Sequence, residues 1–194
     1  MRGKLIALYG INNLGKTTQA RVLVEHLTRE GKQAHYLKYP LYELPPSGPM
    51  INAYLRNGNP HNLSAREFQI LQILNRTQYD SVLRDRIESG EWIVVEDYIG
   101  TGIAWGVGAG VDEAFLQELN SHLLSEDLCV FMDGERFLDG KEEGHKHESD
   151  DVLMQKVRSV HHALAEKRGW FMVDANDSRE KVEEAIWKHV KRLL

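Results

Sequence analysis

Residues 10–18, with the sequence GINNLGKTT, decide the fold of this chain. A glycine followed by four residues and then by glycine, lysine and threonine is the pattern of a phosphate-binding loop. The apolar run Leu5–Tyr9 before it predicts a strand, and apolar residues at helical spacing over 17–30 predict a helix after it. In such a loop Lys16 reaches the β- and γ-phosphates of a nucleotide, and the Thr17 hydroxyl is a ligand for Mg²⁺. We therefore predict a nucleotide-binding loop, the alternative being a glycine turn that precedes a helix by chance.

The composition is that of one globular domain. The 194 residues are 42% hydrophobic and 27% charged, which is enough to bury a single core, and we expect one domain over 1–194. The net charge of −5 argues against a nucleic-acid partner, which requires a basic surface. No run approaches the ~18 apolar residues of a membrane span, so no membrane partner is expected. Cys129 is the only cysteine, so we expect a buried thiol, no internal disulfide and a reducing, cytoplasmic location.

The rest of the chain alternates between apolar runs and amphipathic segments. Ser64 followed by Glu67 forms a capping-box pattern that opens a long helix, and four prolines make 39–49 an irregular loop. Alternating strands and helices predict a parallel sheet covered on both faces, with ligands at the carboxyl ends of the strands. Strands are expected at 5–9, 33–39, 91–98, 127–134 and 169–177, and helices at 17–30, 64–90, 112–124, 150–167 and 178–194.

Charged residues at two places fit a phosphoryl-transfer site. Such a site needs an acid near the metal, and the third strand ends in Glu96 and Asp97. Because consecutive strand residues point to opposite faces, we expect one of these two acids to face the phosphate loop. Both could instead cap the strand end in solvent. Arg76 follows an apolar run in the long helix, where it either binds a ligand or extends to solvent or to a structural partner.

A set of segments recurs in a characteristic order: GINNLGKTTQ, YP at 39–40, LRNG at 55–58, LNR ending at Arg76, VVEDY followed by TGIAWG, and GWFMVDAND. Their order and spacing resemble the thymidylate kinase family of nucleoside monophosphate kinases over nearly the whole chain. The resemblance implies a P-loop NTPase fold with a five-stranded parallel sheet and a short lid at about 134–149. It also implies ATP- and Mg²⁺-dependent phosphorylation of a nucleoside monophosphate, usually dTMP, by a homodimer.

The resemblance implies roles for individual residues. It places Arg76 on the acceptor nucleotide, Glu96 at a catalytic aspartate and Trp105 against the sugar, although Trp105 could simply pack in the core. Thr17 and Glu96 are expected to hold Mg²⁺, partly through water. The expected catalytic residues are Lys16, Glu96, Arg136 and Lys146. The expected ATP contacts are Gly10, Asn12, Asn13, Leu14, Gly15, Lys16, Thr17, Thr18, Asp174 and Ala175. The expected acceptor contacts are Pro40, Tyr42, Leu55, Gln72, Arg76, Asp97, Tyr98, Thr101 and Trp105.

Several positions depart from the family pattern. Asp97 and Tyr42 stand where the family has arginines, and Asn12 stands where it has an acid. A carboxylate aimed at a phosphate dianion would be repelled, so we expect Asp97 to turn toward Mg²⁺ or a neighbouring cation. Gln72 replaces an aromatic that stacks on the base, and its amide could hydrogen-bond a base edge instead. The acceptor base therefore stays open between thymine and another base.

The lid and its flanks offer further candidates. Arg136, Lys141 and Lys146 are alternative sources of the transition-state cation, with Lys146 aligning best. The pair His145-x-His147 resembles a metal site but lacks a nearby cysteine, so solvated histidines are expected. His161-His162 aligns near a helix position that faces the site in the family, although a surface position is expected. The rival functions are a kinase of another nucleotide or of a different small molecule, and a regulatory module that only binds nucleotide.

Overall fold

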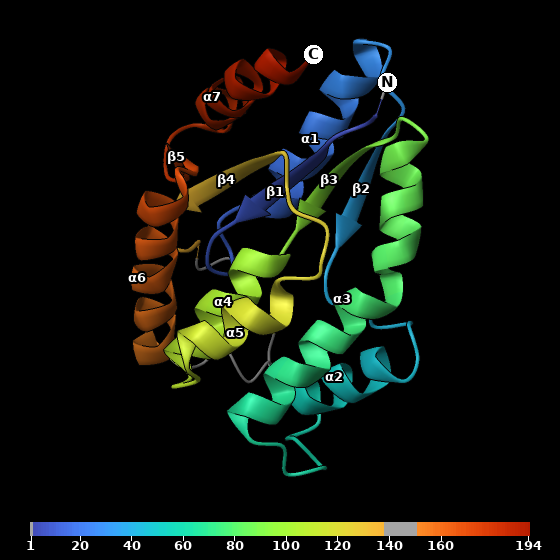
Figure 1. The fold of residues 1–194 in the computed structure, drawn as a ribbon. Helices are drawn as coiled ribbons and strands as arrows, with labels where there is room; N and C mark the ends of the chain where they lie inside the picture. Colours follow the sequence, from blue (N-terminus) through green and yellow to red (C-terminus); the bar gives the residue numbers. More distant parts are fainter. Residues whose placement is uncertain (1, 138–150) are drawn as a thin grey trace.

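The computed structural model describes residues 2–137 and 151–194, and a parallel sheet forms its centre. All five strands end at the same edge of this sheet, because every neighbouring pair is parallel. Their order across the sheet is β2-β3-β1-β4-β5 (Figure 1). The strands are β1 (Leu5–Tyr9), β2 (Ala34–Lys38), β3 (Trp92–Glu96), β4 (Leu128–Asp133) and β5 (Phe171–Asp174).

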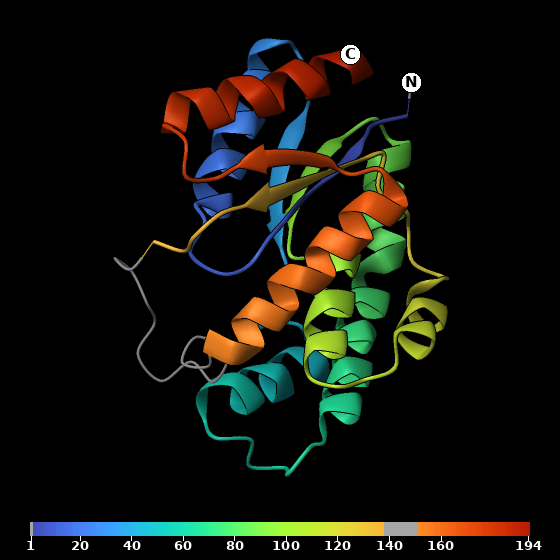
Figure 2. The ribbon, with the colours of Figure 1, turned by 90° about the vertical axis from the view of Figure 1, so that its left-hand side faces the viewer.

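Helices cover both faces of the sheet, as the alternating pattern predicts (Figure 2). On one face α1 packs against α7, and on the other α4 packs against α3 and α6. The α2 helix lies beyond the carboxyl ends of the strands, against the first half of α3 (Figure 1). The helices are α1 (Lys16–Arg29), α2 (Ser47–Arg56), α3 (Ala65–Glu88), α4 (Ile99–Gly108), α5 (Glu113–Asn120), α6 (Asp151–Arg168) and α7 (Arg179–Val190), followed by a 3₁₀ turn at Lys191–Leu193.

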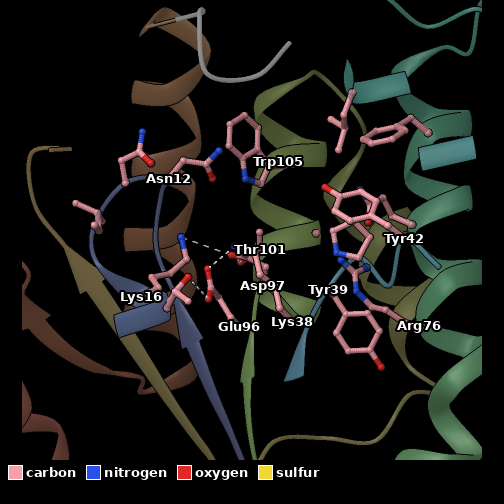
Figure 3. Close-up of a pocket in the computed structure, with 18 of the residues that line it drawn as sticks. Asn12, Lys16, Lys38, Tyr39, Tyr42, Arg76, Glu96, Asp97, Thr101 and Trp105 are labelled. Carbon is pink, nitrogen blue, oxygen red and sulfur yellow. Dashed lines mark hydrogen bonds and ion pairs between the residues drawn. The ribbon is translucent and has the colours of Figure 1, made fainter. Parts of the chain in front are cut away.

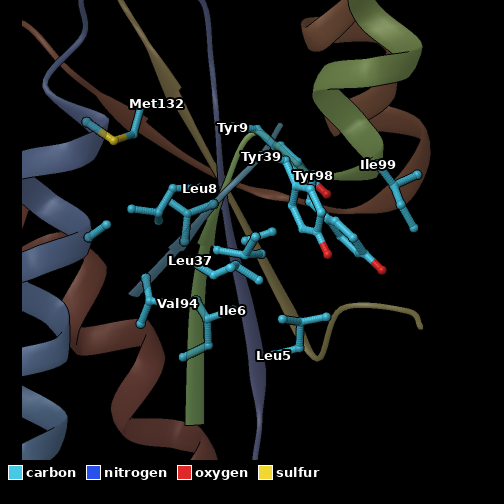
Figure 4. Packing of buried hydrophobic residues seen from close by; sticks show 14 of the residues in the cluster. Leu5, Ile6, Leu8, Tyr9, Leu37, Tyr39, Val94, Tyr98, Ile99 and Met132 are labelled. Atoms are coloured by element: carbon cyan, nitrogen blue, oxygen red, sulfur yellow. The ribbon is translucent and has the colours of Figure 1, made fainter. Parts of the chain in front are cut away.

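The sheet is the main hydrophobic core. Every residue of β1 and β3 is buried, as expected for central parallel strands with both faces covered. At the junction with α4, the rings of Tyr39 and Tyr98 lie 5.4 Å apart between centroids, with Tyr9 beside them (Figure 4). These packed rings lie next to the carboxyl ends of the strands, where ligands bind in such sheets.

Two helices differ from the sequence prediction. The loop expected over 39–49 gives way to α2 at Ser47, because Pro46 precedes the helix and Pro49 lies in its first turn, where a missing N–H costs nothing. The α4 helix was not predicted, because its sequence IGTGIAWGVG holds four residues of low helix propensity. Packing overrides that propensity: a Cβ at Gly100 would lie 2.5 Å from Trp170 and 2.9 Å from Tyr9. Only a glycine allows this close approach.

The long helix α3 begins where the sequence predicts. The Ser64 hydroxyl accepts a hydrogen bond from the Glu67 amide, and the Glu67 carboxylate accepts one from the Ser64 amide, which completes the capping box. The first half of α3 forms a second apolar cluster with α2, in which Tyr54 stacks on Phe68 with ring centroids 3.7 Å apart. No helix in the described part of the chain is long and apolar enough to cross a membrane.

Candidate active site

One cavity of about 570 Å³ opens at the carboxyl ends of the strands, between the phosphate loop and the α2–α3 pair (Figure 3). We call its two sides the phosphate-loop end, formed by 12–17, and the acceptor end, formed by the side chains of Tyr42, Leu55, Phe68, Gln72, Arg76 and Trp105. Glu96 and Asp97 lie between the two ends (Figure 3).

The phosphate-loop end has the backbone geometry that its sequence predicts. Gly15 is left-handed with φ 76°, and it directly precedes the first residue of α1. The Lys16 side chain is only 4% exposed, and its Nζ donates to the carbonyl oxygens of Gly10 at 3.1 Å and Ile11 at 2.8 Å. The Lys16 side chain therefore folds back onto its own loop. The backbone N–H groups of such a loop and the N-terminus of the helix after it create a positive potential that favours phosphate.

Glu96 is the best-connected side chain of the site. Its Oε2 accepts hydrogen bonds from the Thr17 hydroxyl at 2.8 Å and the Tyr36 hydroxyl at 2.7 Å, and its Oε1 accepts one from Lys38 Nζ at 2.9 Å. Burial raises the pKa of Glu96. The charges of Lys16 and Lys38 and the hydrogen bonds from Lys38 and Tyr36 lower it by a larger amount, so the net shift is downward. Glu96 is thus an ionised carboxylate fixed against the phosphate loop.

Asp97 also faces the phosphate loop, so the prediction that only one of the two acids does so is wrong. Its φ of 62° is left-handed, which breaks the alternation of side chains at the end of β3. Its Oδ1 lies 3.6 Å from Lys16 Nζ and accepts a hydrogen bond from the Thr101 hydroxyl at 3.2 Å. Burial raises the pKa of Asp97, Lys16 opposes that shift and the charge of Glu96 adds to it, with a net rise. Asp97 turns toward a neighbouring cation, as expected.

Arg76 brings a buried cation to the acceptor end. It is 2% exposed, and its Nε and Nη1 have no hydrogen-bond partner within the described residues. Burial lowers the pKa of the guanidinium, and Tyr98, Tyr39, Tyr9 and Asp97 oppose that shift only in part. A buried donor without a partner costs free energy. The arrangement therefore fits a group that becomes hydrogen-bonded when an anionic or carbonyl-bearing ligand enters.

Asn75, next to Arg76 in α3, forms hydrogen bonds to the loop before α2. The carboxamide of Asn75, which is fully buried, accepts from the Leu41 amide at 2.8 Å and donates to the Leu41 carbonyl at 3.0 Å and to Ser47 Oγ at 2.8 Å. These three bonds satisfy the buried amide and hold the loop that carries Pro40 and Tyr42 at the cavity.

Most predicted site residues meet at this cavity. Tyr98 instead lies in the core, fully buried, with its hydroxyl bonded to the Leu124 carbonyl at 3.1 Å. Asp174 lines a separate hollow beside Arg158, and Ala175 is 4% exposed next to it in the chain. Gly10 and Thr18, at the two ends of the motif, do not line the cavity. The predicted residues that line it are Asn12, Asn13, Leu14, Gly15, Lys16, Thr17, Pro40, Tyr42, Leu55, Gln72, Arg76, Glu96, Asp97, Thr101 and Trp105.

Of the predicted lid cations, the structure describes only Arg136. Arg136 forms an ion pair with Asp151 at the start of α6, and its side chain is 12% exposed. Lys141, Lys146 and the pair His145-x-His147 lie outside the described residues. Across 2–137 and 151–194, no three histidine, cysteine or acidic side chains cluster as metal ligands would.

His161 is not at the surface, so that prediction is wrong. It is fully buried on the inner face of α6 and stacks on Phe131 with ring centroids 5.5 Å apart. Its Nδ1 lies 3.0 Å from the Val157 carbonyl, and Nε2 has no partner in the described part of the chain. Burial lowers its pKa to about 3. His162 is the more exposed of the pair, and its Nε2 lies 3.1 Å from Asp133 Oδ2.

Several residues that line the cavity were not predicted from the sequence. Lys38 is the last residue of β2, and its place at a carboxyl strand end is a signal that could have identified it. Gln69 is one helical turn before Gln72, on the same face of α3. Tyr39, Arg56 and Gly102 lie within segments that carry the family resemblance, although no role was assigned to them. The missed residues are Lys38, Tyr39, Arg56, Phe68, Gln69, Gly102 and Phe137.

The oxygen atoms of the site suit a magnesium ion. Mg²⁺ prefers hard oxygen ligands, keeps several waters and takes one or two carboxylates. The Thr17 hydroxyl and the Glu96 carboxylate already lie 2.8 Å apart between oxygens, and the carboxylate of Asp97 is beside them. These residues therefore fit the ion that a phosphate loop employs.

Comparison with known proteins gives one consistent match. A family model described as "Thymidylate kinase" matches residues 8–186. The thymidylate kinase of Halothermothrix orenii is 28% identical over 211 aligned residues, which cover 100% of this chain and 99% of that protein. The thymidylate kinase of Homo sapiens is 27% identical over 190 residues, covering 95% and 88%. A solved structure of thymidylate kinase from Candida albicans superposes with a TM-score of 0.81 at 24% identity, covering 98% and 92% of the two chains, and shows the same fold.

Proposed function

This chain belongs to the thymidylate kinase family, and we propose that it transfers the γ-phosphoryl group of ATP to dTMP, forming ADP and dTDP. One observation carries the proposal: a single cavity joins a phosphate loop to a buried arginine, two of whose nitrogens lack partners within the described residues. An oxygen of the acceptor phosphate attacks the γ-phosphorus, and the bond from that phosphorus to the bridging oxygen of ADP breaks. No covalent intermediate with the protein is required.

At the phosphate-loop end, the residues bind and neutralise ATP. Backbone N–H groups of 12–17 hold the phosphates, and Lys16 extends from its own carbonyls to the β- and γ-phosphates. Thr17 and Glu96 would hold Mg²⁺, partly through water, and that ion supplies charge neutralisation when bound. Glu96 is already oriented for this role by Tyr36 and Lys38.

At the acceptor end, the residues position dTMP. Arg76 offers Nε and Nη1 to the nucleotide, and charge-assisted hydrogen bonds of this kind are about twice as strong as neutral ones. Thr101 and Trp105, which are both 8% exposed, form the wall next to Asp97, where the sugar is held. Gln72 and Tyr42 complete the pocket for the base and phosphate.

The chemistry then depends on placing two phosphates in contact and offsetting their charge. A cation from the lid completes the site, with Lys146 as the first candidate and Arg136 as the second. Arg136 is held by Asp151 in the structure, so a contribution from it requires that this ion pair opens.

The acceptor is tested by measuring ADP formation from ATP with each common nucleoside monophosphate. We expect dTMP to give the highest kcat/KM. Activity with a purine monophosphate and none with dTMP would overturn the base assignment, and would favour an acceptor that hydrogen-bonds to Gln72. No acceptor-dependent ADP with any monophosphate would overturn the kinase assignment and favour a module that only binds nucleotide.

We also propose that the chain acts as a homodimer. The α3 helix carries three large apolar side chains on its solvent side: Ile70 is 47% exposed, Leu74 is 41% exposed and Val82 is 44% exposed. A second copy packed on this surface would bury them. Light scattering on the purified protein should give twice the mass of the 194-residue chain, and a monomer at micromolar concentration would contradict the proposal.

A further inference from the structure

Lys38 is a cation that β2 presents to the middle of the cavity. Side chains two apart on a strand share a face, so Tyr36 and Lys38 both point toward Glu96. Lys38 Nζ lies 2.9 Å from Glu96 Oε1. The Glu96 side chain is only 3% exposed, whereas the Lys38 side chain is 47% exposed. The ammonium group is thus held in place by one contact and is open to the cavity on its other side.

Two carboxylates, those of Glu96 and Asp97, lie near the ammonium group of Lys38. The left-handed backbone at Asp97 places a second carboxylate next to Glu96 in the cavity (Figure 3). A phosphate dianion entering this region would meet two carboxylates. Lys38 contacts one of these carboxylates directly, with Nζ 2.9 Å from Glu96 Oε1, and its positive charge offsets theirs.

The other cations that line the described part of the cavity lie toward its two ends. Lys16 is occupied by its own loop and lies 3.6 Å from Asp97. Arg76 is packed against Gly102, and Arg56 lies over the Tyr42 ring at 4.7 Å from the ring centroid and bonds to Asn52. Lys38, between the acids and the acceptor end, is the cation placed to meet the phosphate of an acceptor (Figure 3).

We propose that Lys38 binds the phosphate of the acceptor monophosphate, an inference that rests on the proposed function. An ammonium group has three donors, so Nζ keeps its bond to Glu96 and donates a second one to a phosphate oxygen. The contact offsets the repulsion from Asp97 and places the attacking oxygen beside the phosphate loop. Lys38 is therefore a binding residue for the acceptor phosphate as well as a support for Glu96.

The test compares a nucleotide with its nucleoside, because only the nucleotide carries the phosphate. Titration calorimetry would measure Kd for dTMP and for thymidine with the wild type, Lys38→Gln and Lys38→Arg. Glutamine keeps a donor for Glu96 but removes the charge, whereas arginine keeps the charge. We expect Lys38→Gln to raise Kd for dTMP about tenfold or more, to change Kd for thymidine less than about twofold, and Lys38→Arg to restore most of the loss.

The matched control is Lys181→Met, since Lys181 pairs with Asp177 on the surface of α7, away from the cavity, and should change neither Kd. Melting temperatures would confirm that each variant is folded. An unchanged Kd for dTMP with a lower kcat would overturn the proposal, because Lys38 would then only orient Glu96. An equal loss of dTMP and thymidine binding would also overturn it, because the pocket itself would have changed.

The same experiment tests the role of Lys38 independently of which base the acceptor carries. If the wild type phosphorylates another monophosphate instead of dTMP, the same comparison is made with that nucleotide and its nucleoside. A selective loss of the nucleotide in Lys38→Gln would then support the role of Lys38 while the base assignment fails. The absence of a selective loss would overturn the role of Lys38 whichever base is used.

Discussion

The two ends of the cavity are built in different ways. The phosphate-loop end comes from one continuous segment, 12–17, between a buried strand and the helix that follows it. The acceptor end is assembled from the loop after β2 and from α2, α3 and α4. It rests on its own apolar cluster, which includes Tyr54 and Phe68. Local sequence determines the first end, whereas tertiary packing determines the second.

The two ends also differ in how their cations are compensated without ligand. Lys16 has two carbonyl oxygens and Asp97 within reach, so its charge is largely satisfied. Arg76 is buried with two nitrogen atoms that lack partners in the described structure. The free protein therefore carries an energetic cost at the acceptor end that a nucleotide bound as proposed would relieve. Mutations at the two ends should separate activity from stability in different ways.

The largest effect is expected for Lys16→Met. Methionine retains the apolar stem but removes the cation that stabilises charge during transfer, so turnover should fall at least about 10³-fold. The melting temperature without ligand should change little, because Lys16 bonds to its own loop rather than to the core. Steady-state kinetics and thermal denaturation would check this prediction, and an active variant would remove the phosphate-loop assignment.

Arg76→Met should weaken acceptor binding about 10- to 100-fold and leave ATP binding nearly unchanged, because it removes charge-assisted hydrogen bonds made only to the acceptor. It should not lower the melting temperature without ligand, since it replaces an unsatisfied buried charge by an apolar side chain. Calorimetry with dTMP and with ATP would measure the difference.

The control for that experiment is Arg29→Met, because Arg29 is exposed and pairs with Glu25 on α1. This control should leave both affinities unchanged. A strong loss of stability in Arg76→Met, with both affinities reduced alike, would mean that Arg76 is a structural residue rather than a ligand contact.

A smaller effect is expected for Gly102→Ala. A Cβ at this position would lie 2.6 Å from Nη1 and Nη2 of Arg76, so the guanidinium must move while the fold is retained. Acceptor affinity should fall about tenfold, since the hydrogen bonds lose their geometry. The double variant Gly102→Ala/Arg76→Met should be no worse than Arg76→Met alone, because both changes act on the same guanidinium. Additive losses would show that Gly102 acts elsewhere.

These expectations show how far the sequence determines the molecule. The β1–loop–α1 unit and the capped helix α3 follow from local patterns, and the predicted parallel sheet and kinase family are confirmed. The α4 helix was missed because its glycines are selected for close contact with Trp170 and Arg76, which a one-dimensional pattern does not contain. Asp97 was expected to lie opposite Glu96 because strand alternation says nothing of a left-handed residue at a strand end.

The smallest functional effect is expected away from both ends, at His161. Its pKa of about 3 in the folded protein lies below the ordinary value of about 6.5. The unfolded chain therefore binds a proton that the folded protein excludes, and stability falls as pH drops from about 6.5 toward 3, by up to about 1.4 kcal/mol per pH unit. His161→Phe should flatten this dependence without changing activity at pH 7. Chemical denaturation between pH 4 and 7 would check it, and parallel curves would contradict the assignment.

In the proposed mechanism, the two ends of one cavity hold two nucleotides with their phosphates in contact. A molecule that joins adenosine to thymidine through five phosphates should fill both ends at once, and titration calorimetry measures how it binds. We predict one molecule per chain, bound more tightly than ATP or dTMP alone, after which neither nucleotide binds to the saturated protein. Binding of ATP or dTMP to the saturated protein, or two molecules of the joined nucleotide per chain, would contradict this mechanism.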